Sequence, residues 1–391
     1  MPFLNGLNLN RDALANLSDN HATIVELERL LNLIRPNNNG TGIEAASGPS
    51  GSQMSGFRNK IINGAFDVNQ ITPSRIFSQN GDFLALDKWY IGSSGLTDPV
   101  LISNNTGPFD FSRSVKLQPT TAGVPSGSDR YVYFTQAIKG NDVRTLSNKC
   151  TLSFQVKSNL AGQKFSVAFR TLNALQSFMY DYKILKADEW QKESVTIDVN
   201  TNIGLNLVLD CLFCFHSGGL YNTPSIQKWV NGNFIASSFI NSIFGSINNY
   251  VEIAAIQVES GDVATPFEHR PLSVENALCQ FYYQNIGGFS NGIVLGTGQI
   301  ASNNSVSLFS IPQSVPMRIA PQMSFNQLRI EHPSVGSFLV TGTISNNISP
   351  VRNCYSFFTA GSPFPNSIIG HAANLRLGDS GTGSYLTLDA N

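Results

Sequence analysis

Hydrophobic residues recur at a helical period only near the start of the chain. In residues 10–35 they fall at alternating spacings of four and three, a heptad pattern that predicts a helix with a coiled-coil seam. Asn10 is placed to cap this helix and Pro36 to end it. The predicted seam consists of Leu17, Asn20, Ile24, Leu27, Leu31 and Ile34.

The composition of the seam bears on the number of helices. Leu and Ile are mixed at both core positions, which favours three helices over two, and Asn20 would set their register. We therefore expect a homotrimer. The alternative is an amphipathic helix that lies on a globular domain. Residues 36–55 favour the coiled coil, because they are rich in Asn, Gly, Ser and Pro and predict a flexible linker.

The first nine residues form a short apolar tail. Its hydrophobic side chains, separated by Asn and Gly, are Phe3, Leu4, Leu7 and Leu9. A peptide of this kind is either disordered or docked into a partner protein, and we expect it to be an attachment peptide.

In residues 56–272 the hydrophobic residues recur at every second position instead. Short alternating runs are separated by turn clusters, the pattern of an all-β sandwich. The clearest predicted strands are 114–118, 131–135, 150–157, 165–171, 190–199 and 205–215. With further strands near Ile61, Trp89 and Val251, they are enough for two packed antiparallel sheets of jelly-roll type.

A second β-region follows, and it is predicted to form a domain of residues 273–391. It begins with a short connecting helix, for which Ser273 is a plausible N-cap. Its expected strands are 292–299, 306–311, 321–330, 337–343, 355–360 and 385–388. The predicted fold class is therefore mainly β, with an N-terminal coiled-coil helix, a jelly-roll sandwich and a second, smaller sandwich.

Composition narrows the possible partners. Of 391 residues only 13% are charged, and the net charge of −1 gives no reason to expect nucleic acid or an anionic membrane as partner. The most apolar stretch, 203–215, is interrupted by Asn206 and Asp210, so no membrane insertion is expected. The N-terminus has no apolar signal region, and five scattered cysteines predict reduced, buried thiols.

Patterns that resemble catalytic or metal sites are weak. Cys211 and Cys214 have the spacing of a metal knuckle, but on a strand they point to opposite faces. Residues 378–381, Gly-Asp-Ser-Gly, resemble a protease nucleophile motif, yet His371 lies in the wrong order and too close to act as its base. We expect no catalytic residue, no metal and no cofactor.

A glycan-degrading enzyme would need two carboxylates held across a groove. The acidic candidates are Asp181, Asp188, Glu189 and Asp210, and none of them belongs to a recognisable motif.

Aromatic residues are the remaining candidates for binding. Sugars stack their apolar faces on exposed rings, and amides bind the hydroxyl groups. Tyr221 and Trp229 lie in a long polar segment, and Phe289 and Tyr385 lie in the C-terminal region. For Trp229 the alternative is simple packing. Trp89 and Trp190 adjoin strands and are expected in the core.

Three motifs resemble a known family. Residues 257–271, Q-V-E-S-G-D-V-A-T-P-F-E-H-R-P, followed by A-L-C-Q-F-Y-Y, resemble the domain-closing signature of tail-fibre and receptor-binding proteins of tailed bacteriophages and prophages. Residues 59–66 with 87–90 upstream, and residues 315–321 downstream, are further matches. The resemblance implies a virion fibre protein with a jelly-roll, carbohydrate-binding-like domain and no enzymatic activity.

The sequence therefore predicts a trimeric fibre or spike, assembled in the host cytoplasm and displayed on the virion. Its expected partners are further copies of itself, another virion protein at residues 1–9, and a host cell-surface polysaccharide or lipopolysaccharide. One alternative is a purely structural head or baseplate decoration protein. Another is a polysaccharide-degrading tailspike.

Overall fold

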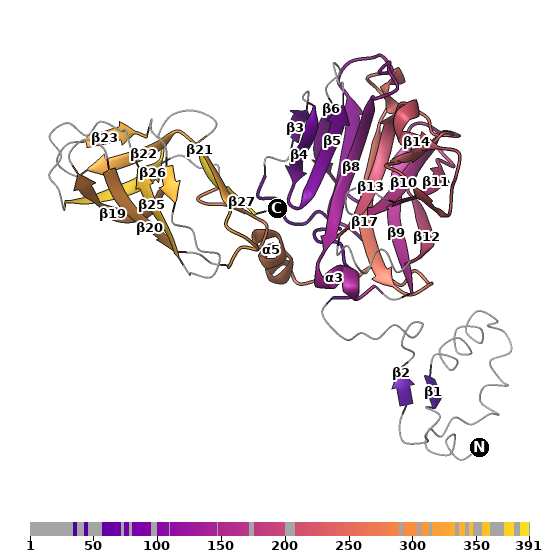
Figure 1. Cartoon of the computed structure of the whole chain (residues 1–391), viewed down its shortest axis with the longest axis horizontal. Helices are drawn as coiled ribbons and strands as arrows, with labels where there is room; N and C mark the ends of the chain where they lie inside the picture. Colours follow the sequence, from indigo (N-terminus) through magenta and orange to yellow (C-terminus); the bar gives the residue numbers. More distant parts are fainter. Residues whose placement is uncertain are drawn as a thin grey trace.

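The computed structural model contains two β-sandwiches joined by a short helix (Figure 1). It describes residues 34–36, 43–45, 57–71, 74–77, 80–94, 100–108, 110–146, 148–171, 176–199, 208–288, 292–302, 306–312, 315–332, 336–340, 344–346, 354–359, 371–378 and 384–390. Antiparallel sheet predominates in these residues, which confirms the mainly β fold class.

Most of the predicted coiled coil, residues 10–33, lies outside the described residues, as does the attachment peptide. The last seam position, Ile34, lies in strand β1 (Ile34–Pro36), which pairs with β2 (Ile43–Ala45). Pro36 explains the extended backbone, because a proline disfavours the helical conformation at the residue before it. The expected linker therefore contains one short strand.

The first sandwich is built from two sheets. Sheet I has the order β15 (Trp229–Asn231), β11 (Gln176–Lys183), β10 (Lys164–Thr171), β13 (Val208–Ser217), β8 (Tyr131–Lys139), β5 (Trp89–Ser94) and β4 (Gly81–Leu86). Sheet II has the order β12 (Gln191–Asp198), β9 (Lys149–Ser158), β17 (Val251–Ser260), β7 (Ser114–Pro119), β6 (Val100–Asn105) and β3 (Ser74–Phe77). Every pairing within these two sheets is antiparallel.

A continuous apolar core lies between the two sheets. Alternate residues of each strand point inward, such as Leu152, Phe154 and Val156 on β9, and all three are buried. Trp89 is fully buried, as predicted, and stacks on Phe134 with ring centroids 4.8 Å apart. The predicted alternation therefore corresponds to the packed interior of a sandwich.

Short elements cap the ends of the sheets. Helix α3 (Asn141–Arg144) joins β8 to β9. The long connection from β13 to β17 contains η3 (Gly219–Tyr221), η4 (Ile243–Gly245) and the parallel pair β14 (Asn222–Thr223) and β16 (Ala236–Ser237). Side chains of this connection cover part of the outer face of sheet I.

Residues 57–71 do not form the strand that was expected near Ile61. Turns occupy 61–65, although the backbone still bonds to β17, through Lys60 N to Val258 O at 2.7 Å and Ile256 N to Gly64 O at 3.0 Å. A bulge in β17 between Ala254 and Gln257 makes room for this segment. The prediction failed because a short apolar run can also fill a turn that packs on a sheet.

Helix α5 (Leu272–Gln280) connects the sandwiches, as expected, but Ser273 is not its N-cap. Pro271 occupies that position, and its carbonyl oxygen accepts the N–H groups of Val274 at 2.9 Å and Glu275 at 3.1 Å. The backbone carbonyl therefore starts the helix without a side-chain cap.

The second sandwich also has two sheets. Sheet III has the order β23 (Gly336–Leu339), β22 (Leu328–His332), β26 (Ala372–Leu377), β19 (Val294–Ser302), β20 (Val306–Pro312), β25 (Cys354–Thr359) and β24 (Ile344–Asn346). Sheet IV consists of β18 (Tyr283–Asn285), β27 (Tyr385–Asp389) and β21 (Gln322–Asn326). The strand expected over 321–330 is split at Gln327, whose φ is +54°, so its halves join different sheets.

The two sandwiches contact each other beside α5 (Figure 1). Gln70 donates to the carbonyl oxygen of Tyr283 at 3.2 Å, and Asn285 donates to that of Gln70 at 3.0 Å. The Lys88 ammonium lies 3.6 Å from the ring centroid of Tyr282. This contact joins a turn of the first sandwich to the end of the connecting helix.

Candidate functional site

The segments that carry the sequence resemblance meet in space. Residues 57–66 begin the first sandwich, and residues 257–271 leave it. The Glu268 carboxylate accepts the backbone N–H groups of Arg58 at 3.0 Å and Asn59 at 2.9 Å. One acidic side chain therefore ties the end of the signature to the start of the domain.

Arg270 is the centre of the same network, and only 4% of its side chain is exposed. Its guanidinium contacts Glu275 at 3.0 Å and Glu268 at 3.4 Å, and it donates to the carbonyl oxygens of Ile61 at 3.2 Å and of Asn59. A buried guanidinium with two carboxylates is stable only when such partners surround it.

Gln257 and Glu259 complete the network on β17. The Gln257 amide oxygen accepts the N–H of Glu268 at 2.8 Å, and its NH₂ group donates to Glu259 at 2.9 Å. Glu259 also accepts the N–H and hydroxyl of Thr265, at 2.8 and 2.6 Å. We call Asn59, Gln257, Glu259, Glu268, Arg270 and Glu275 the closing network. Its polar atoms stabilise the fold, so the most specific motif of the sequence has a structural role here.

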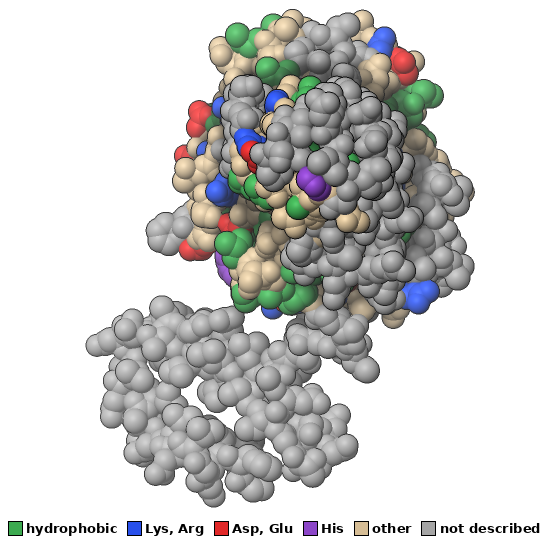
Figure 2. Space-filling model, turned by 90° about the vertical axis from the view of Figure 1, so that its left-hand side faces the viewer, with side chains coloured by type: hydrophobic (Ala, Val, Ile, Leu, Met, Phe, Trp, Pro, Cys, Tyr) green, Lys and Arg blue, Asp and Glu red, His purple; other side chains and the backbone are tan. Residues whose placement is uncertain are grey.

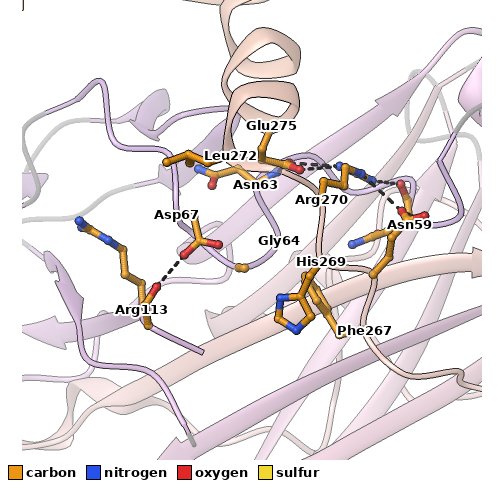
Figure 3. A pocket seen from close by; sticks show the side chains of 13 residues that line it. Asn59, Asn63, Gly64, Asp67, Arg113, Phe267, His269, Arg270, Leu272 and Glu275 are labelled. Carbon is orange, nitrogen blue, oxygen red and sulfur yellow. Dashed lines mark hydrogen bonds and ion pairs between the residues drawn. The ribbon is translucent and has the colours of Figure 1, made fainter. Parts of the chain in front are cut away.

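A chamber of about 400 Å³ lies against the closing network (Figure 3). Its walls come from residues 59–67, the loop at Ser112 and Arg113, the connector 267–270 and helix α5. Asp67 accepts the Ser112 hydroxyl at 2.8 Å. In Figure 3, His269 and Phe267 lie across from Asp67 and Arg113, with Leu272 and Glu275 above.

A larger groove of about 710 Å³ lies on the outer face of sheet II. Its floor consists of side chains that point away from the core, on β12, β9 and β17. Lys192 lies directly across from Gln155, which in turn pairs with Ala254. The walls are residues 110–111 and 264–267, together with His269.

Three rings separate the groove from the chamber. Phe111 stacks on His269 with centroids 5.2 Å apart, and Phe267 meets each of them edge-on at 5.0 Å. Phe267 and His269 line both cavities. The aromatic surface beside polar floor residues has the character of a small-ligand site.

Trp190 lies on this outer face and not in the core between the sheets, so that prediction was wrong. It packs with Phe267 on the small side chains of Ala254 and Ala255. The Lys157 ammonium lies 4.8 Å from its ring centroid and pairs with Glu252 at 2.9 Å. Trp190 therefore covers the outer face of β9 and β17.

The predicted binding residues are not brought together in one site. Trp229 is half-buried, donates its indole N–H to Asp198 O at 2.7 Å and packs on Phe178 with centroids 5.7 Å apart. Tyr221 is also half-buried and meets Tyr131 edge-on at 5.2 Å, on the outer face of sheet I. Both rings are engaged in packing.

The C-terminal candidates lie elsewhere. Tyr385 is half-buried on β27 of sheet IV, in the second sandwich. Phe289 lies outside the described residues, as do Phe3, Leu4, Leu7 and Leu9 and the seam positions Leu17, Asn20, Ile24, Leu27 and Leu31.

The acidic candidates are dispersed as well. Asp181 accepts the hydroxyls of Ser166 and Ser237 at 2.5 Å, which anchors β16 to sheet I. Asp210 pairs with Arg170 at 3.3 Å, and burial raises the pKa of its carboxyl. Asp188 accepts the Tyr250 hydroxyl, and Glu189 pairs with Lys186 on the surface.

Cys211 and Cys214 point to opposite faces of β13, as predicted. Cys211 lies in the core between the sheets, and Cys214 lies under the connection that covers sheet I. Burial raises the pKa of both thiols. Among the described residues, no group of three or more His, Cys, Asp or Glu side chains is arranged to hold a metal ion.

Among the described residues visible in Figure 2, charged side chains do not gather in one patch. Viewed from the side of the second sandwich, basic and acidic groups lie singly and intermixed (Figure 2). Within the part of the chain that the structure describes, no helix has both the length and the apolar character needed to cross a membrane.

No protein-family model matches the chain, and no curated protein matches it. Among solved structures, a tailspike of bacteriophage CBA120 is similar at 11% identity and a TM-score of 0.27, over 53% of this chain and 22% of that one. A putative sugar binding protein from Bacteroides thetaiotaomicron is similar at 15% and 0.28, over 52% and 99%.

A family 11 carbohydrate-binding module from Clostridium thermocellum, in complex with a mixed-linked tetrasaccharide, is similar at 12% identity and a TM-score of 0.27, over 50% of this chain and 99% of that one. Similarity at this level carries no argument about what this chain binds.

Proposed function

We propose that this chain is a receptor-binding protein of a tailed-phage-like particle. It binds a host-surface polysaccharide or lipopolysaccharide as a homotrimer, is attached to the virion through residues 1–9, and has no enzymatic activity. The observation that carries the proposal is the groove on the outer face of sheet II, where rings and polar side chains line one cavity.

The chemistry of the groove suits a sugar. The exposed ring of His269, which is stacked on the buried ring of Phe111, offers its outer face to the apolar side of a pyranose, and the half-buried Phe267 lies beside it. The Gln155 amide and the Lys192 ammonium can bind its hydroxyl groups. Lys192 is exposed and Gln155 is half-buried, so a ligand can reach both without any rearrangement of the core.

The remaining parts of the proposal rest on the sequence. The virion location is supported by the resemblance to tail-fibre proteins, which is carried by residues 59–66, 257–271 and 315–321. The trimeric state is supported by the heptad pattern. Three copies raise a weak affinity for a repeating surface polymer through effective concentration, so no single groove needs to bind tightly.

The test is binding of the full chain to an array of bacterial polysaccharides and lipopolysaccharides. The double variant Gln155→Ala/Lys192→Ala should weaken retention on any bound glycan at least tenfold, because each lost contact costs about 1 kcal/mol or more. Lys183→Ala, an exposed lysine on β11 outside the groove, is the matched control and should bind as the original chain does. If the double variant bound as well as the original chain, the groove would be excluded as the glycan-binding site.

One observation favours a second candidate, a purely structural virion protein. The closing network uses the polar side chains of the signature to hold the chain together, which accounts for the motif without any receptor. In that case the double variant would assemble into particles that adsorb to cells normally, and the array would show no bound glycan.

The proposed absence of enzymatic activity is tested with the polysaccharide that the array identifies. A polysaccharide retained by the chain should show no new reducing ends and no new unsaturated ends after prolonged incubation. Their appearance, and their loss on substitution of Asp110 or Asp67 by Asn, would instead identify a polysaccharide-degrading tailspike.

A further inference from the structure

The chamber beside α5 is separate from the sheet groove but shares a wall with it. Phe267 and His269 present one side to the groove and the other to the chamber. A polymer that lies along the sheet and passes over this pair of rings therefore arrives at the chamber.

Two sides of the chamber away from the rings are formed by α5 and by the first turn of the sandwich. Leu272 and Glu275 of α5 form one wall, and the turn at Gly64 forms another. The turn lies directly on β17, since a Cβ at Gly64 would come within 2.1 Å of the Ile256 carbonyl oxygen. A chain that reaches the chamber meets the helix and the packed turn on these two sides, which favours its ending there.

The chamber has two kinds of wall. On the inner side, the carboxylates of Glu268 and Glu275 already bind Arg270 and backbone N–H groups. On the outer side, Asp67 is exposed and accepts the Ser112 hydroxyl at 2.8 Å. A carboxylate that accepts a serine hydroxyl can accept a sugar hydroxyl in the same way.

The volumes agree with a difference in role. About 400 Å³ is near the lower end of small-ligand sites, and about 710 Å³ lies well within their range. The chamber therefore suits one terminal sugar, and the groove suits the units that follow it.

We propose that the chamber recognises the end of the bound polysaccharide, with the Asp67 carboxylate on the hydroxyls of the terminal sugar and the ring of His269 against its face. This inference rests on the proposed glycan-binding function, which it refines from polysaccharide in general to chain ends. When a polysaccharide is bound by its end, the number of binding sites it offers equals the number of chains. When it is bound along its length, that number depends on the total mass of polymer.

Shearing the receptor tests this directly. The probe is the polysaccharide retained in the array screen, used intact and after sonication, as a competitor of binding by the full chain. Sonication multiplies chain ends at constant mass. If ends are bound, the mass needed for half-inhibition should fall in proportion to the mean chain length.

Two variants separate the cavities. Asp67→Asn should weaken binding at least tenfold and remove the dependence on chain length, whereas Asp110→Asn, an exposed acid in the groove, should retain that dependence. Inhibition that depends only on mass, with binding intact, would overturn end recognition and leave the proposed function standing. Failure of every polysaccharide to bind would overturn both.

Discussion

The guanidinium of Arg270 donates to the carbonyl oxygen of Ile61 across 209 residues of sequence, at 3.2 Å. This bond joins the last residues of the first sandwich to its first turn. The same guanidinium holds Glu275 of the connecting helix, so one side chain fixes the start of the sandwich, its end and the helix to the second sandwich.

Replacing Arg270 with Ala should lower the free energy of unfolding by about 3–5 kcal/mol, because the partly buried carboxylates of Glu268 and Glu275 would lose their shared cation and keep only backbone N–H donors. Urea denaturation of the full chain measures the loss. Lys186→Ala breaks an exposed pair with Glu189 and should change stability by at most about 1 kcal/mol. A loss at Arg270 no larger than this control would mean that the closing network contributes little.

Gly64 should tolerate no side chain. An added Cβ would lie 2.1 Å from the backbone oxygen of Ile256, so either the turn or β17 must move. We expect Gly64→Ala to cost about 1–3 kcal/mol. Gly219→Ala is the matched control, since nothing lies within 4 Å of its added Cβ. Thermal denaturation of both variants provides the comparison, and equal melting temperatures would contradict the close contact.

Lys88 should make stability depend on pH near neutrality. Burial lowers the pKa of its ammonium group to about 7, with Lys139 and Arg318 acting in the same direction and Cys279 and Asp389 opposing. The unfolded value is about 10.4, so between pH 7 and 10 the unfolded chain binds more protons at this residue. Its contribution to stability therefore rises with pH, by at most about 1.4 kcal/mol per unit.

The measurement is urea denaturation at pH 7, 7.75 and 8.5, comparing the original chain with Lys88→Met. The window ends at 8.5 because buried thiols act in the opposite direction above it: burial raises the pKa of Cys279 in the folded state, so the unfolded chain loses those protons first. The stability of the original chain relative to the variant should rise across the window. A constant difference would show that Lys88 is charged throughout.

Trp229 should prove to be a packing residue. Trp229→Phe removes the indole bond to Asp198 and should cost about 1 kcal/mol, while adsorption to cells per folded molecule stays unchanged. Tyr221→Ala removes the ring that packs on Tyr131 and should likewise lower stability without changing adsorption per folded molecule. Loss of adsorption at unchanged melting temperature would restore either ring as a receptor contact.

The oligomeric state is the main sequence prediction still to be measured. Light scattering of the full chain should give a mass near three times 42.5 kDa, and a chain without residues 1–55 should be monomeric if the seam holds the trimer. A monomer at full length would favour the alternative in which the helix packs on a globular domain.

Alternation of side chains was the feature that predicted the fold best. Strands such as β9 and β10 direct every second residue into the core between the sheets, and their hydrophobic alternation follows from that arrangement. Strand β11 was missed because its polar and aromatic residues do not alternate cleanly. The segment at Ile61 was misassigned because its apolar side chains pack in a turn.

The candidate site was much harder to predict. Phe111 and Phe267 are 156 residues apart in sequence, and only the pairing of β7 with β17 brings their loops together. The exposed-aromatic criterion pointed to Trp229 and Tyr221 because it cannot tell a ring that covers a sheet from one that faces solvent. The signature at 257–271 supplies residues to both candidate cavities, although its polar residues bind each other.

The backbone enters and leaves the first sandwich at one point, where Lys60 bonds to Val258 and Glu268 bonds to Arg58. A unit whose two ends meet in this way can be exchanged as one piece, provided that the replacement brings the same closing residues and keeps the contacts that Gln70 and Lys88 make with the second sandwich. Under the proposed function, the groove could then change while the segments on either side stay the same.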